Sequence, residues 1–328
     1  MNGKRLLVSA SPHIHAPETT RGIMLDVILA LLPALAAAIW LFGSRAAVLT
    51  AVCVGTAVLA EWLSRKAMKR PNTIGDLSAV VTGLLLALNL PATLPLWMAA
   101  VGSVIAIVVV KQMFGGIGQN FVNPALTARI ILMVSFPTAM ARWVAPFEHA
   151  WSADAVTQAT PMASLAAGGN AVSDSLPSFS QMLFGLHGGS MGEVCSLALL
   201  LGGAYLLIRR VISPIIPVAY LGTVALWMLA AGHGDLTFVA YELLGGGLLL
   251  GAIFMATDYT TSPITAKGKW IFGIGCGIIT SVIRLYGSLP EGVSFSIILM
   301  NILVPHIERL TQPRAFGAEK KAKEAAKK

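Results

Sequence analysis

The chain has 328 residues, of which 56% are hydrophobic and only 12% are charged, and its net charge is +8. A soluble domain carries about 25% charged residues, so this composition excludes an ordinary water-exposed surface and indicates a protein embedded in a bilayer. The positive charge does not indicate nucleic-acid binding, because the lysines and arginines lie between apolar runs and form no basic patch interleaved with aromatic residues.

Ten apolar runs follow a polar, turn-rich N-terminal segment. The first five runs cover residues 22–42, 46–63, 77–90, 94–114 and 124–136. A long polar interval, residues 137–193, separates them from five further runs at residues 194–208, 214–231, 238–257, 270–286 and 293–307. A tail rich in lysine and alanine closes the chain.

We therefore expect an all-α polytopic membrane protein with about ten transmembrane helices, because helices satisfy their own backbone groups inside lipid. Five spans in each half force the halves into opposite orientations, the plan of an inverted repeat. Internal similarity supports the repeat, because Trp97 and Trp270 each begin a span that ends in an aromatic–glycine pair. The alternative to a repeat is chance similarity among leucine- and glycine-rich helices. The expected parts are an N-terminal segment (1–21), a first transmembrane half (22–136), an outer-face loop (137–193), a second transmembrane half (194–308) and a basic tail (309–328).

Basic residues accumulate in alternate segments between the runs. One set of segments holds residues 4, 5, 21, 65, 66, 69, 70, 111, 209, 210, 267 and 269 and the basic tail. The other set holds only Arg45, Arg142 and, at a helix end, Arg284. Since cytoplasmic loops carry the excess of lysine and arginine, we expect both termini in the cytoplasm and the 137–193 loop on the outer face of a bacterial inner membrane.

A few polar residues lie within or beside the apolar runs. Arg129 lies inside the fifth run, where a charge costs about 3 kcal/mol on insertion scales. It is interpreted either as an anion contact or a gate, or as a structural arginine paired with backbone carbonyls or a partner subunit. Asp26 and Asp258, near span ends, either contact a transported ion or are merely solvated. The asparagines either line a polar cavity or hydrogen-bond between helices; they are Asn89, Asn120, Asn123 and Asn301.

Neither a metal site nor a catalytic group is expected. Cys53, Cys195 and Cys276 are far apart and lie in or beside apolar runs, which is typical of small buried hydrophobic residues. His13 and His15 form a single pair without further ligands, which is too little for a metal centre.

Asp154, Thr157, Ala159 and Thr160 follow the pattern Asp-x-x-Ser/Thr-x-Ala-Thr inside the polar interval. From composition alone the segment is a loop, in which Asp154 or Thr157 caps a short helix. The pattern also resembles the signal read by bacterial flavin transferases, which join the phosphate of FMN to the last threonine. That resemblance makes Thr160 the acceptor and Asp154 a recognition element for the transferase. Gln158 occupies the position where glycine is usual.

Further stretches extend the resemblance over nearly the whole chain. They are residues 11–13, 24–27, 31–33, 81–84, 88–91, 114–120, 123–125, 154–160, 255–259, 261–263 and 290–295. Together they resemble the family of the D subunits of Rnf ion-translocating electron-transport complexes. The B subunit of the sodium-pumping NADH:quinone reductase is a close relative of these subunits.

This resemblance implies a membrane subunit of an ion-translocating ferredoxin:NAD oxidoreductase, with electron flow coupled to transport of Na+ or H+. It implies covalent FMN on Thr160 and allows a second, non-covalent flavin, riboflavin or FMN. With this function, the anion contact considered for Arg129 includes a flavin, and the ion considered for Asp26 and Asp258 is the coupling ion. The implied partners are the other subunits of the complex, including a second FMN-carrying subunit and the Fe–S membrane subunits, and a flavin transferase, with membrane lipid around the chain and no nucleic acid.

Two other functions remain open. Ten spans and inverted symmetry alone suit a flavin-free transporter or channel, although such a protein has no need of the Asp154–Thr160 pattern. A structural scaffold with an unmodified Thr160 is compatible with the departure at Gln158.

Overall fold

A computed structural model describes residues 19–148, 158–167, 176–287 and 292–313. Within these residues the chain is helical and contains no β-strand. The first half contains α1 (Thr20–Phe42), α2 (Ser44–Ala67), the short η1 (Ile74–Asp76), α3 (Ser78–Leu88), α4 (Leu96–Val104) continued by the π-helix η2 (Ile105–Gln112), and α5 (Pro124–Ser135). The second half contains α9 (Ser196–Ile208), α10 (Ile215–Ala231), α11 (Leu236–Leu244), α12 (Leu248–Leu250) continued by the π-helix η3 (Gly251–Met255), α13 (Ala266–Tyr286) and α14 (Val293–Thr311).

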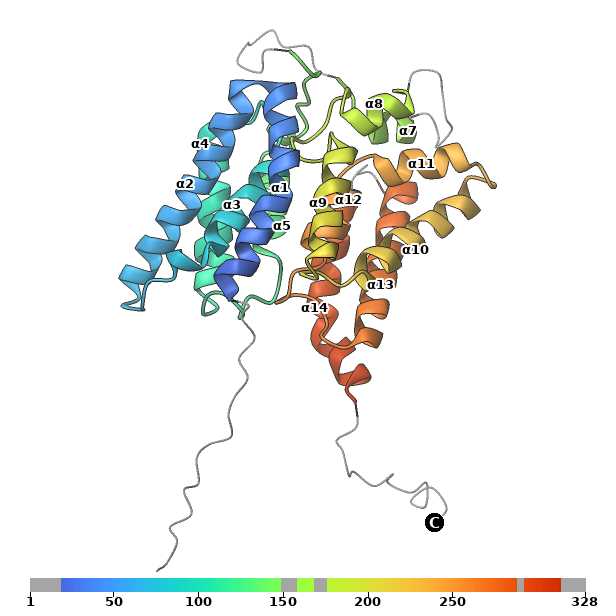
Figure 1. The fold of residues 1–328 in the computed structure, drawn as a ribbon. Helices are drawn as coiled ribbons and strands as arrows, with labels where there is room; N and C mark the ends of the chain where they lie inside the picture. The colour runs from blue at the N-terminus through green and yellow to red at the C-terminus, as the bar shows by residue number, and fades with distance from the viewer. Residues whose placement is uncertain (1–18, 149–157, 168–175, 288–291, 314–328) are drawn as a thin grey trace, which may run out of the picture.

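Short helices occupy the polar interval between the halves: α6 (Pro137–Met140), α7 (Pro161–Ala167) and α8 (Phe179–Phe184). Figure 1 shows α7 and α8 at one end of the molecule, whereas α1 begins and α14 ends at the opposite end. We call these the loop face and the terminal face. α7 and α8 of the polar interval thus lie at the end of the molecule opposite the start of α1 and the end of α14 (Figure 1).

The helices match the ten predicted runs, but with different lengths. By length and composition α1, α2, α13 and α14 can each cross a membrane alone, and α11 with α12–η3 forms a pair bent by 64°. The other five predicted runs correspond to shorter apolar helical segments, 10–17 residues long. α1 begins where the Thr19 hydroxyl accepts the Gly22 N–H and ends at Gly43, whose φ is +69°. Its 23 residues extend about 35 Å at about 1.5 Å per residue.

The two halves share one packing scheme. α2 contacts α3 and α4 in the first half, and α10 contacts α11 and α13 in the second. α4 contacts α5, as α13 contacts α14. The halves meet where α1 packs on α9 and α5 packs on α14. Figure 1 shows α1 running from the terminal face to the loop face and α9 running back, as an inverted repeat requires.

Gly202 lets α1 and α9 approach closely. A Cβ at this position would overlap the carbonyl oxygen of Ala30 and lie 3.0 Å from the ring of Phe254. We expect Gly202→Ala to destabilise the protein by about 1–3 kcal/mol, because a backbone atom cannot move aside as a side chain can. Thermal unfolding in detergent, followed by tryptophan fluorescence, measures this effect. Gly222→Ala is the control, since nothing lies within 4 Å of its Cβ position; equal midpoints for the two variants would contradict the close approach.

Candidate functional site

Thr160 lies on the loop face, at the start of α7. Its side chain is only 3% exposed, and its Oγ1 accepts the N–H of Ala163 at 3.1 Å, so Thr160 caps the helix. The adjacent Gln158 is exposed, and its N–H donates to the carbonyl of Trp143. The predicted acceptor is therefore packed and hydrogen-bonded rather than freely accessible. Asp154 and Thr157 lie outside the described residues, while Ala159 is described and exposed.

The segment after Thr160 packs against a helix break formed by Gly245, Gly246 and Gly247. A Cβ at Gly245 would lie 2.6 Å from the Met162 sulfur, so only glycine leaves room there. Gly246 has φ +65°, a conformation that side chains rarely adopt. α11 ends at this break and α12 begins after it. The apolar run at residues 238–257, predicted as one span, is therefore two helical pieces joined at an angle.

Two arginine side chains lie beside the glycine break. Arg284 of α13 forms an ion pair with Glu242 of α11 at 2.9 Å and donates to the carbonyl of Gly245 at 3.1 Å, with both charged side chains almost fully buried. On the other side, a Cβ at Gly247 would lie 3.5 Å from Arg129 Nη1 and 3.4 Å from Glu193 Oε2. The break leaves the Gly245 carbonyl without its helical hydrogen bond, and the buried Arg284 guanidinium donates one instead. Lipid could not do so, because it offers no hydrogen-bond donor at this depth.

Arg129 is 3% exposed and donates to the side-chain oxygen of Asn89 at 2.7 Å. The Asn89 amide nitrogen in turn donates to the carbonyl of Leu85 at 2.7 Å. Asn89 therefore links α3 to α5 instead of lining an open cavity. Arg129 and Thr160 are far apart in the chain, yet Arg129 and Met162, which lies two residues after Thr160, are both close to the same glycine break.

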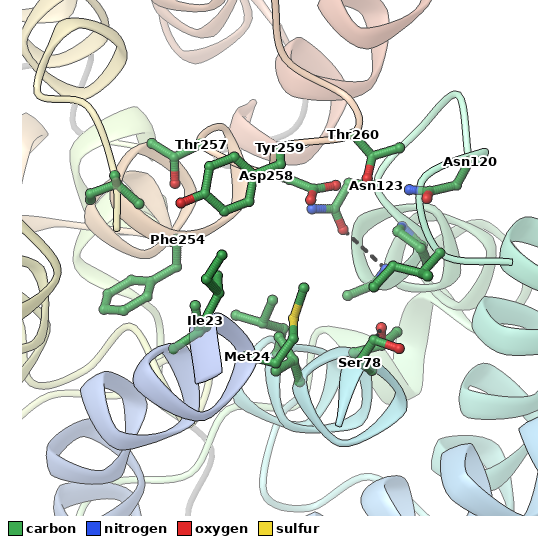
Figure 2. Close-up of a pocket in the computed structure, with 18 of the residues that line it drawn as sticks. Ile23, Met24, Ser78, Asn120, Asn123, Phe254, Thr257, Asp258, Tyr259 and Thr260 are labelled. Carbon is green, nitrogen blue, oxygen red and sulfur yellow. Dashed lines mark hydrogen bonds between the residues drawn. The ribbon is translucent and has the colours of Figure 1, made fainter. Parts of the chain in front are cut away.

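A separate pocket lies between the halves toward the terminal face (Figure 2). It has a cavity volume of about 100 Å³ behind an open mouth, and it is lined mostly by apolar side chains together with hydroxyl, amide, carboxyl and ammonium groups. Figure 2 labels ten lining residues: Ile23, Met24, Ser78, Asn120, Asn123, Phe254, Thr257, Asp258, Tyr259 and Thr260. A concave space of this kind, apolar with a few convergent polar groups, is typical of a small-molecule site.

The polar wall of the pocket joins both halves. Asn123 caps α5 by accepting the Ala125 N–H at 3.1 Å, and its amide nitrogen donates to the Met255 carbonyl at 3.3 Å. Asn120 also lines the pocket, so two of the four predicted asparagines contribute to a polar cavity. Asn301 instead bonds between helices: when its amide is oriented to suit its neighbours, its oxygen accepts the Asn123 N–H at 3.1 Å.

Asp258 follows η3 in the loop before α13 and lines the pocket. Burial raises the pKa of its carboxyl above the ordinary value, against the lowering effect of a hydrogen bond from Thr261. Asp26 lies elsewhere, at the contact between α1 and α9. There it accepts the Tyr205 hydroxyl at 2.9 Å and pairs with Arg209 at 3.3 Å. The structure therefore places only Asp258 at a cavity.

A buried charge network borders the pocket and was not singled out from the sequence. Lys111 of η2 forms an ion pair with Glu61 of α2 at 2.9 Å and donates to the Ser78 hydroxyl at 2.6 Å. Thr73 donates to the other carboxylate oxygen of Glu61 at 2.6 Å. Lys111 and Ser78 both line the pocket. The signal was present in the sequence, because Glu61 and Lys111 are single charges within apolar runs.

Comparison with known proteins gives consistent matches over the chain. The sequence model of the NQR2, RnfD, RnfE family matches residues 7–317. A protein of Acetobacterium woodii, named as the D subunit of a Na+-translocating ferredoxin:NAD+ oxidoreductase complex, is 50% identical over 327 residues and covers 99% of both chains. One of Clostridium ljungdahlii, named for a proton-translocating complex of the same kind, is 42% identical over 95% of this chain and 96% of its own. The D subunit of an ion-translocating oxidoreductase complex of Halorhodospira halophila is 38% identical over 94% of each chain.

Proposed function

The chain belongs to the NQR2, RnfD, RnfE family, and from this membership we propose that it is a membrane subunit of an ion-translocating ferredoxin:NAD+ oxidoreductase. In that role it carries electrons within the complex and is not catalytic alone. The observation that supports this most is the 50% identity to the D subunit of the Acetobacterium woodii complex along essentially the whole chain. Its partners in this proposal are the other subunits of the complex. The named relatives differ in coupling ion, Na+ in one and protons in another.

Covalent FMN on Thr160 is the second part of the proposal. The Asp154–Thr160 pattern supports it, as does the place of Thr160 on the loop face. An ester oxygen at Thr160 can still accept the Ala163 N–H, so the cap at 3.1 Å is compatible with a phosphoester. The flavin ring, however, needs an opening in the packing around a side chain that is 3% exposed. Transfer therefore acts on a form in which α7 has moved away from the α11–α12 break.

The pocket between the halves suits a second, non-covalent flavin. Its apolar walls can contact the faces of an isoalloxazine ring, and the amides of Asn120 and Asn123 can hydrogen-bond the ring edge. The flavin supplies one- and two-electron transfer when bound, while the protein orients it and sets the local field. The ion pair of Lys111 with Glu61, whose ammonium borders the same space, contributes a fixed dipole to that field.

We expect Val27→Trp to remove the non-covalent flavin, because Val27 lines the pocket and an indole would fill it. The amount of flavin released from the purified, acid-precipitated chain should fall by about tenfold or more. A tenfold change corresponds to about 1.4 kcal/mol of binding free energy. Leu29→Trp is the matched control, since Leu29 lies on the same helix with 43% of its side chain exposed. Acid-released flavin that is unchanged in Val27→Trp would exclude this pocket as the site.

The basic residues support a cytoplasmic terminal face in a bacterial inner membrane. α2 and α9 end there, and α13 begins there, next to Arg65, Lys66, Arg209, Lys267 and Lys269. The positive-inside rule assigns such a face to the cytoplasm. The pocket then lies toward the cytoplasm and Thr160 toward the outside, on opposite sides of the hydrocarbon core.

One observation favours a second candidate, a flavin-free transporter subunit. The 64° break between α11 and α12–η3 resembles the discontinuous helices that bind substrates in transporters. The two candidates differ in one measurable property, the flavin content of the purified chain.

A further inference from the structure

Arg65, near the end of α2, is a buried cation without a counterion among the described residues. Its side chain is 8% exposed, and its Nε is enclosed without a hydrogen-bond partner. Glu61, one turn earlier, does not neutralise it, because both oxygens of that carboxylate are bound by Lys111 and Thr73. A buried charge without a partner is strongly unfavourable, so the fold is expected to supply an anion from outside the described chain.

The surroundings of Arg65 contain further unused hydrogen-bonding groups. Gln112 of η2 is fully buried, and neither atom of its side-chain amide has a partner in the described part of the chain. A Cβ at Gly116 would overlap Arg65 Nη2 and lie 3.7 Å from Gln112 Oε1. Gly115 and Gly116 have φ values of +126° and +107°, which favour glycine. The Arg65 guanidinium and the Gln112 amide thus both lie against this glycine turn, and the absence of a side chain at Gly116 makes room for the guanidinium.

Arg65, Gln112 and the glycine turn lie near side chains that are typical of the depth of the lipid headgroups. Trp62, Phe114 and Phe121 are 41%, 49% and 50% exposed, although they are large apolar side chains. The Lys66 ammonium lies 4.9 Å from the centre of the Trp62 ring. Aromatic and basic residues together mark the membrane–water interface.

We propose that Arg65, Gln112 and the Gly115–Gly116 turn bind the headgroup phosphate of an anionic phospholipid of the cytoplasmic leaflet. The guanidinium donates two parallel hydrogen bonds to the phosphate oxygens, a geometry for which arginine is well suited. The Gln112 amide donates a third hydrogen bond. The acyl chains then lie along the exposed aromatic side chains. This site is separate from both flavin positions, and its assignment to the cytoplasmic leaflet rests on the membrane orientation of the proposed function.

Native mass spectrometry of the full-length, delipidated chain in neutral detergent tests the site. We expect phosphatidylglycerol to bind at lower concentration than phosphatidylcholine. Arg65→Leu should weaken phosphatidylglycerol binding by about tenfold to a hundredfold, as expected for loss of a charged hydrogen bond. Arg70→Leu is the matched control, because Arg70 is an exposed arginine of the same basic stretch, and it should change binding by less than about twofold.

A second variant keeps the test independent of folding. Gln112→Met keeps the volume of the side chain and removes a buried amide without a partner, so it should unfold at the same temperature or higher. It should still weaken phosphatidylglycerol binding by about threefold to tenfold. Equal weakening by Arg65→Leu and Arg70→Leu would overturn the site in favour of general surface charge. Displacement of the lipid by millimolar inorganic phosphate would overturn the lipid source and assign the site to a free anion.

Discussion

Thr160→Ala is expected to leave the chain without covalent flavin when it is produced together with a flavin transferase. The phosphoester requires a hydroxyl at the last position of the Asp154–Thr160 pattern, and alanine has none. Intact-mass spectrometry of the purified chain measures the effect, which should be complete rather than partial. The variant also loses the helix cap that Thr160 Oγ1 gives to Ala163, at a cost of about 0.5–2 kcal/mol.

Two further variants separate modification from folding. Thr160→Asn keeps an efficient N-cap side chain but has no hydroxyl to esterify, so it should remain unmodified with α7 intact. Ser164→Ala removes a hydroxyl one turn later, on the same helix, and should carry flavin like the unaltered chain. Covalent flavin in Thr160→Asn, or its loss in Ser164→Ala, would show that Thr160 is not the acceptor.

Glu61→Ala is expected to cost about 3–5 kcal/mol of stability, the largest loss we expect from one side chain. Glu61 is fully buried and is the anionic partner of Lys111, itself 3% exposed. Its removal leaves the Lys111 ammonium buried and uncompensated. The loss appears as a lower midpoint of thermal unfolding in detergent.

The double variant Glu61→Leu/Lys111→Met provides the control. Replacing both charges with apolar side chains of similar size removes the unpaired charge and should restore most of the stability. Deleting an exposed ion pair, by contrast, costs at most about 1 kcal/mol, so Asp26→Asn, at the partly exposed pair with Arg209, should have a small effect. If Glu61→Ala and Asp26→Asn cost the same, the buried network does not stabilise the contact between α2 and η2.

The number and type of the helices could be predicted from hydropathy, because each apolar run satisfies its backbone only as a helix. The break at Gly245–Gly247 could not, since glycine is common in membrane helices and the run at residues 238–257 stays apolar through it. It forms because Arg284, which pairs with Glu242 from 42 residues away, donates a hydrogen bond to the freed carbonyl of Gly245. Such a tertiary contact leaves no local pattern.

The candidate site was predictable only in part. The pattern that ends at Thr160 was visible as a motif, but the burial of Thr160 depends on Met162 packing against Gly245. Asn120 and Asn123 were recognised as candidates for a polar cavity, whereas Asn89 pairs with Arg129, a choice that only packing decides. Lys111 was counted among the basic residues of the cytoplasmic side, and the structure buries it against Glu61. Single charges in apolar runs indicated that partners exist without identifying them.

In-gel ultraviolet fluorescence of the denatured, unaltered chain, purified from cells that contain a flavin transferase, tests the central claim most directly. Denaturation releases any non-covalent flavin, so fluorescence that remains reports only a covalent bond. A fluorescent band at the mass of the chain is the result that we predict. A dark band, with an intact mass equal to that of the sequence, would contradict covalent FMN on Thr160 and favour the flavin-free transporter.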